Sequence, residues 1–133
     1  MTLRDIGRLV TYWKQGSELN FESAKAIAEK SKKYVEALFF LHLSCEKIVK
    51  AYYVQKKQEH APYSHNLLYL AKLGALELEK HDEKLLSEIN EYNLECRYPD
   101  DKYLIYKKAT QELFEAYFKK VEKFRTWILK KLK

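Results

Sequence analysis

An arginine beside a helix-breaking proline is the feature of this sequence best suited to chemistry. Arg97 and Tyr98 directly precede Pro99, one of only two prolines in the chain. A guanidinium is planar and carries five N–H donors, so it suits phosphate, and at a helix end it also meets free carbonyl groups. The residues alone leave two roles for Arg97 open: contact with phosphate or a partner, and a structural ion pair with Asp100 or Asp101. We expect Asp101 to cap the last helix.

A charged pair, Glu46 and Lys47, follows the longest apolar stretch of the chain, and Lys50 comes one helical turn after Glu46. A glutamate four residues before a lysine stabilises a helix surface by a few tenths of a kcal/mol. The second interpretation places Glu46 at the edge of a buried face, where its carboxylate accepts hydrogen bonds from Arg97 and orients it.

The histidines offer a structural and a catalytic interpretation. His65 follows Ser64, the residue expected to cap a helix, and it is either bonded to a backbone carbonyl or catalytic. His42 lies on an apolar helix face near Cys45. A metal needs three or four converging ligands, and the sequence shows no second cluster. We therefore expect neither a metal nor a cofactor.

The excess positive charge is confined to the end of the chain. Residues 106–133 hold nine bases and three acids, a difference of +6 that equals the net charge of the whole chain. On one continuous helix, Lys108, Lys119, Lys123 and Lys130 share a flank that could follow a phosphate backbone. The alternative is an ordinary solvated lysine face.

Composition predicts a single all-α domain spanning residues 1–133. Hydrophobic residues make up 47% of the chain, whereas there are only three glycines and two prolines, too few for a sheet protein with many tight turns. No apolar run approaches the roughly 18 residues of a membrane span. Cys45 and Cys96 show no metal-binding spacing, so we expect a cytoplasmic protein with reduced thiols.

Hydrophobic periodicity predicts five helices in an antiparallel up-and-down bundle with a four-helix core. Thr2 and Asp5 resemble a capping pair at the first helix, and Gly16 is a candidate for a kink or for a late start of that helix. The last helix is expected to bury a stripe that includes Tyr106 and Thr110. The predicted helices cover about residues 3–31, 34–57, 66–74, 79–94 and 102–132.

The second predicted helix is apolar on two sides. Leu38, His42 and Cys45 share one face at about 100° per residue, whereas Phe40 and Leu43 point to the opposite side. A helix that is apolar on two sides is usually buried on two sides. It is therefore either the central helix of the bundle or the contact face of a homodimer.

Several stretches, taken in order, resemble the HEPN family, whose name stands for higher eukaryotes and prokaryotes nucleotide-binding. They are YWKQGSELNFESAKAIAEKSKKYVEALFFLHLSCEKIVKAYYV, APYSHNLLYLAKLG, INEYNLECRYPDD and WIL, and they extend from about Tyr12 to Leu129. The most telling pieces are Glu46-Lys47 with Lys50, the loop from Pro62 to Leu67, and Arg97 with the three residues after it. Their order and spacing make the resemblance specific.

The resemblance implies a helical bundle, often dimeric, that acts with a minimal nucleotidyltransferase as a toxin–antitoxin pair. Many members of the family are metal-independent ribonucleases whose motif is an arginine, four to six residues and a histidine. Arg97 matches the arginine, but Lys102, Tyr103 and Leu104 occupy the histidine positions. Tyrosine and lysine titrate near pH 10 and do not replace an imidazole. His65 is the histidine that could serve instead.

We therefore predict a HEPN-like domain that binds nucleotide or RNA phosphate and works with a nucleotidyltransferase, which in this family can transfer adenylate to a tyrosine. The alternatives are an active endoribonuclease toxin using Arg97 and a non-catalytic dimeric interaction module. The predicted phosphate-binding residues are Arg97, Lys47, Lys50 and Tyr98. The predicted supporting residues are Glu46, Asp100 and Tyr103, and the candidate catalytic residues are Arg97 with His65.

Overall fold

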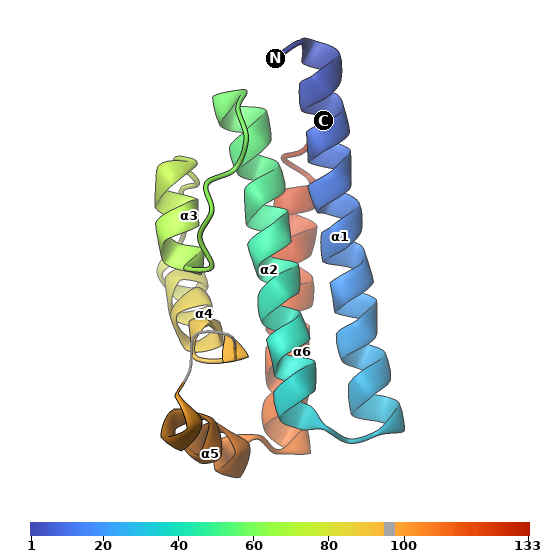
Figure 1. Ribbon diagram of the computed structural model, residues 1–133, viewed down its shortest axis with the longest axis vertical. Helices are drawn as coiled ribbons and strands as arrows, with labels where there is room; N and C mark the ends of the chain where they lie inside the picture. Colours follow the sequence, from blue (N-terminus) through green and yellow to red (C-terminus); the bar gives the residue numbers. More distant parts are fainter. Residues whose placement is uncertain (95–97) are drawn as a thin grey trace.

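The computed structural model describes residues 1–94 and 98–133, which form six helices and no strand (Figure 1). The helices, in chain order, are α1 (Leu3–Lys30), α2 (Tyr34–Lys57), α3 (Leu67–Leu73), α4 (Lys80–Asn90), α5 (Pro99–Lys108) and α6 (Gln111–Leu129). The all-α prediction is confirmed. None of these helices is both long and apolar enough to cross a membrane, within the residues described.

Four helices alternate in direction and make up the bundle. Figure 1 shows α1 and α4 running down the page, and α2 and α6 running up. The short helix α3 packs beside α2 and α4, and α5 lies across the lower end of the bundle. The two chain ends lie near the opposite, upper end. The predicted antiparallel bundle with a four-helix core is the observed architecture.

The predicted start of α1 is confirmed, whereas the kink at Gly16 is not. The Thr2 hydroxyl accepts a hydrogen bond from the Asp5 N–H at 3.1 Å, and the Asp5 carboxylate accepts one from the Thr2 N–H at 3.1 Å. The helix runs without interruption through Gly16. A Cβ atom at Gly16 would lie 3.0 Å from Cδ of Lys47, so this glycine allows the Lys47 side chain to pass close to α1.

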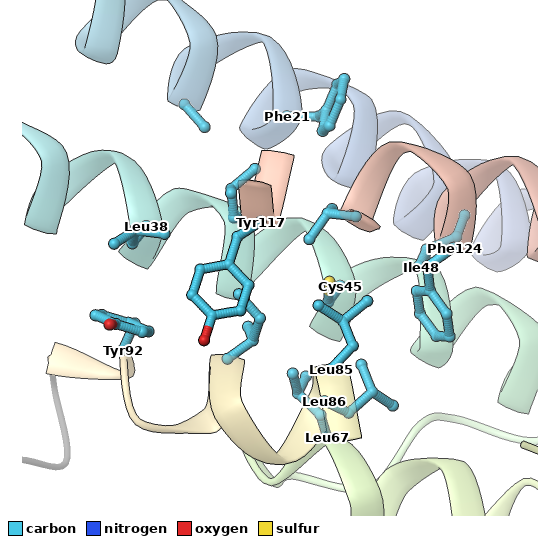
Figure 2. Close-up of a cluster of buried hydrophobic side chains, with 14 of the residues drawn as sticks. Phe21, Leu38, Cys45, Ile48, Leu67, Leu85, Leu86, Tyr92, Tyr117 and Phe124 are labelled. Carbon is cyan, nitrogen blue, oxygen red and sulfur yellow. The ribbon is translucent and has the colours of Figure 1, made fainter. Parts of the chain in front are cut away.

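The helix α2 is central, as its two-sided apolar pattern predicts. It packs most extensively on α1 and also contacts α3, α4 and α6. Side chains over most of the circumference of α2 are fully buried, including Leu38, Ile48 and Val54, whereas Phe40 and Leu43 are half-buried. Figure 2 shows several of these side chains packed with residues of α3, α4 and α6. This burial fixes the direction in which each polar side chain of α2 points.

The cap prediction at the start of α3 is wrong in detail. Asn66, not Ser64, caps α3: its side chain accepts a hydrogen bond from Tyr69 N–H at 3.2 Å, whereas the Ser64 hydroxyl accepts one from Asn66 N–H. At the other end, Gly74 is the C-cap residue, and Ala75 after it adopts the left-handed conformation, with φ of 55°. Asparagine and serine are nearly equivalent as caps, so sequence does not separate them.

The predicted last helix is two helices. It begins at Pro99, three residues earlier than expected, because proline is well tolerated in the first helical turn. Tyr98 is the N-cap residue of α5, and Asp101 lies within the helix with its side chain outside the described residues. Thr110 then starts α6 by accepting a hydrogen bond from Leu113 N–H at 3.1 Å. Tyr106, expected to be buried, is half exposed, and α4 ends at Asn90 rather than near Leu94.

Candidate functional site

A buried carboxylate joins α2 to the loop before α3. Glu46 is only 4% exposed, and each of its oxygens has a partner. Oε1 lies 2.8 Å from Nδ1 of His65, and Oε2 accepts a hydrogen bond from Nζ of Lys50 at 3.1 Å. A carboxylate removed from water needs such bonds to offset its desolvation. We name Glu46, Lys50 and His65 the carboxylate cluster.

His65 is held through its backbone as well as its ring. Its carbonyl oxygen lies 3.0 Å from Nε2 of His42, a fully buried histidine of α2. The next residues are tied to α4, since Asn90 accepts a hydrogen bond from Leu67 N–H and donates one to the side chain of Asn66. The loop before α3 is therefore fixed by two helices that are distant in sequence.

The bond to Glu46 determines which nitrogen of His65 carries a proton. A carboxylate accepts hydrogen bonds, so Nδ1 of the imidazole is the donor. In the neutral ring the basic lone pair is then on Nε2. The side chain of His65 is 28% exposed, and the ring of Tyr63, itself 95% exposed, meets it edge-on at 5.7 Å. An imidazole oriented by a carboxylate is suited to proton transfer.

The two lysines beside Glu46 have different environments. Lys50 is 5% exposed, and its ammonium lies 5.1 Å from the centre of the Trp13 ring. Its charge is thus engaged by a carboxylate and an aromatic face, which leaves no surface for the direct phosphate contact predicted for it. Lys47 is only half buried and points past Gly16 of α1. Of these two lysines, Lys47 is the one that a ligand can reach.

The other predicted site residues lie on α5 or outside the described residues. Tyr98, at the start of α5, is 79% exposed, and Tyr103 is 61% exposed with Nζ of Lys107 4.7 Å above its ring. In Figure 1, α5 lies below the loop that leads into α3. Arg97 falls outside the described residues, as does the side chain of Asp100. The expected contact between Glu46 and Arg97 therefore stays a prediction.

A second polar cluster was missed by the sequence analysis. The hydroxyl groups of Ser17 and Ser44 each donate to the other residue's carbonyl oxygen at 2.8 Å, across the contact of α1 and α2. Arg125 of α6 donates from Nε to Ser17 Oγ at 3.0 Å and from Nη2 to Glu18 at 2.6 Å. Its guanidinium also lies 4.8 Å from the centre of the Phe21 ring. We name Ser17, Ser44 and Arg125 the serine–arginine clamp.

Nothing in the sequence marks the clamp, because Ser17 and Arg125 are 108 residues apart. Arg125 was counted only as one of the surplus bases near the chain end, yet it is 5% exposed. The continuous lysine flank predicted for the last helix is also wrong, since Lys108 lies on α5 and the other three lysines follow the break at Thr110. The basic surface of α6 is consequently shorter than expected.

Among the described residues, this region offers neither a group of metal ligands nor a reactive thiol. Burial raises the pKa of the Cys45 thiol to about 12, so at neutral pH it stays protonated and is a poor nucleophile. Among residues 1–94 and 98–133, no group of three or more histidine, cysteine, aspartate or glutamate side chains is placed to hold a metal ion. The carboxylate cluster is therefore the best-formed candidate site in the described part of the chain.

Comparison with protein families gives a match over most of the chain. The model of the HEPN domain family matches residues 10–132, which is nearly the whole chain and includes all six helices from part-way through α1 onward. No curated protein and no solved structure matches the chain.

Proposed function

The chain belongs to the HEPN domain family, and on this premise we propose that it binds phosphate groups of RNA or nucleotides at the surface beside the carboxylate cluster. The observation that carries the proposal is the buried Glu46 that holds His65 at the surface. In this proposal the protein is cytoplasmic and works with a minimal nucleotidyltransferase in a two-component system of the toxin–antitoxin type.

The chemistry of the surface suits an anion with a reactive sugar–phosphate backbone. Lys47 supplies a reachable ammonium, and His65 supplies an imidazole fixed by Glu46 and by its own carbonyl. Lys50 donates a hydrogen bond to the second oxygen of Glu46 and so helps to fix the carboxylate. Arg97, which matches the family's arginine, is expected to add a bidentate phosphate contact.

The binding proposal is tested with a short single-stranded RNA. We expect Lys47→Gln and Arg97→Ala each to weaken affinity, because each removes one phosphate contact and lowers the slope of log affinity against log salt by about 0.7. Lys57→Gln is the matched control, since Lys57 is an exposed lysine at the far end of the same helix. Equal affinity of Lys47→Gln, Arg97→Ala and the control would refute the proposal.

A second candidate function is metal-independent RNA cleavage. The Glu46–His65 pair favours it, because Nε2 of His65 can accept the proton of a ribose 2′-hydroxyl while that oxygen attacks the adjacent phosphate. A 2′,3′-cyclic phosphate forms, the bond from phosphorus to the 5′-oxygen breaks, and the 5′-oxygen leaves with a proton taken from water. We expect cleavage in the presence of EDTA that is lost in His65→Asn and Arg97→Ala. RNA that stays intact after long incubation with the purified wild-type protein removes this candidate and leaves the binding proposal in place.

Association with other chains is the third part of the proposal. Phe39, Phe40 and Leu43 of α2 are half-buried, and a second copy or the nucleotidyltransferase could pack on their exposed parts. We expect a dimer mass in sedimentation at micromolar concentration, reduced to a monomer by Leu43→Glu. We also expect co-purification with a minimal nucleotidyltransferase encoded beside this chain. If the wild-type protein sediments as a monomer and still binds RNA, the dimer is refuted and the RNA-binding proposal is not.

A further inference from the structure

A groove lies between the end of α1 and the start of α6. Its volume is about 410 Å³, which falls within the range of roughly 300–1,000 Å³ typical of small-molecule sites. The groove shares no residue with the carboxylate cluster, whose members lie on α2 and in the loop before α3. Whatever occupies it is bound independently of the site proposed above.

The floor of the groove is aromatic. The rings of Tyr34 and Phe114 are tilted with centroids 6.2 Å apart, and Phe114 meets Phe118 at 5.8 Å. Phe118 in turn stacks on Phe21 at 4.6 Å, with an interplanar angle of 20°. Tyr34 and Phe118 are partly exposed, whereas Phe114 is buried. Partly exposed rings on a rigid row offer a stacking surface for another planar ring.

The rim of the groove is basic. Lys25 and Lys32 come from α1 and the turn after it, and Lys119 comes from α6. Within residues 1–94 and 98–133, none of these three lysines takes part in an ion pair. Two carboxylates, Glu29 and Glu115, also line the groove. Three ammonium groups against two carboxylates favour a ligand that carries negative charge.

Lys32 also occupies a backbone position that is unusual for a lysine. Its φ is 55°, in the left-handed region that glycine adopts with least strain. Ala75 and Gln58 share this conformation after their own helices, so the strain alone assigns no function. It does provide a variant, Lys32→Gly, that removes the ammonium while suiting the backbone.

We propose that this groove binds a nucleoside monophosphate, with the base against Tyr34 and Phe118 and the phosphate between the lysines. A stacking floor beside a cluster of cations matches the two halves of such a ligand. The carboxylates of Glu29 and Glu115 are placed to accept hydrogen bonds from ribose hydroxyls or from an exocyclic amino group. Glu115 is itself oriented by a 3.0 Å hydrogen bond from the side chain of Gln111.

The test is a titration of the ¹⁵N-labelled full chain with AMP, followed by NMR. We expect saturable shifts of amide signals at the end of α1 and the start of α6, separate from any shifts around His65 at the site proposed above. Adenosine lacks the phosphate and ribose 5-phosphate lacks the base, so each should bind at least about fivefold more weakly. Absence of saturable shifts at about 5 mM AMP, a concentration that detects even millimolar binding, would overturn the proposal.

Matched variants separate loss of binding from loss of folding. Lys25→Gln combined with Lys119→Gln should weaken AMP binding by about tenfold, since two charge contacts are lost. The control combines Lys30→Gln with Lys120→Gln, which removes the same charge from the same helices outside this groove. Lys32→Gly should lower affinity while leaving the melting temperature unchanged or raised. Equal affinities in the groove and control variants would also overturn the proposal.

Discussion

Ser44 and Glu46 lie two residues apart on α2, yet they belong to two different kinds of polar cluster. At about 100° per residue their side chains point about 200° apart around the helix. Ser44 belongs to the serine–arginine clamp, which is closed between α1, α2 and α6. Glu46 belongs to the carboxylate cluster, which ends at His65, an imidazole that is 28% exposed.

The clusters differ in what their bonds present to solvent. In the clamp, the hydroxyls bond to each other's backbone and Arg125 is 5% exposed, so the bonds hold three helices together and present no reactive group. In the carboxylate cluster, the same kind of buried bond fixes a side chain that reaches solvent. A buried charge is therefore informative about function when its network ends at an accessible titratable group.

The largest expected effect is that of removing Glu46. Glu46→Ala leaves the buried Lys50 ammonium without its carboxylate, and we expect the free energy of unfolding to fall by about 3–5 kcal/mol. Urea denaturation measures this free energy of unfolding. The double variant Glu46→Ala with Lys50→Met also removes the unpaired ammonium. It should therefore recover at least half of the lost free energy of unfolding. A loss below about 1 kcal/mol in Glu46→Ala would show that this pair behaves as an exposed one.

Removal of Arg125 is expected to have an intermediate effect. Arg125→Ala deletes a charged donor to Ser17 and Glu18 and its contact with Phe21, so unfolding should become easier by about 1.5–3 kcal/mol. RNA affinity of the folded variant should stay at the wild-type value, since the clamp presents nothing to a ligand. A large loss of RNA affinity at a temperature where the variant is folded would contradict the structural role.

The smallest expected effect comes from the two glycines of α1. Gly7→Ala meets no atom within 4 Å, so it should stabilise the protein by up to about 1 kcal/mol through helix propensity. At Gly16 the added Cβ would lie 3.0 Å from Cδ of Lys47, so that side chain must move and the gain should be smaller. Thermal unfolding measures both gains.

The same pair of variants tests the role of Lys47 without altering any charge. We expect Gly16→Ala to weaken RNA binding through the displaced Lys47 side chain, whereas Gly7→Ala leaves it unchanged. Unchanged affinity in both variants would indicate that the position of Lys47 does not matter for the proposed site.

Local patterns in the sequence predicted most of the helical architecture. The capping pair of Thr2 and Asp5, the helix over residues 34–57 and the central place of that helix are all as expected. The break at Thr110 was missed although a cap residue with Glu112 in the first turn marks it. The apolar stripe of the sequence continues across that point, so helical periodicity alone does not show the break.

The sequence by itself determined an all-α bundle, its family and the identity of the residues worth testing, because helix periodicity, caps and motif spacing act over a few residues to one helix length. Only the tertiary structure decided that Glu46 holds His65, that Lys50 is buried and that Arg125 reaches Ser17. Such contacts depend on the rotation and packing of several helices at once. A rotation of one residue on α2 turns a side chain by about 100°, enough to exchange a buried partner for solvent.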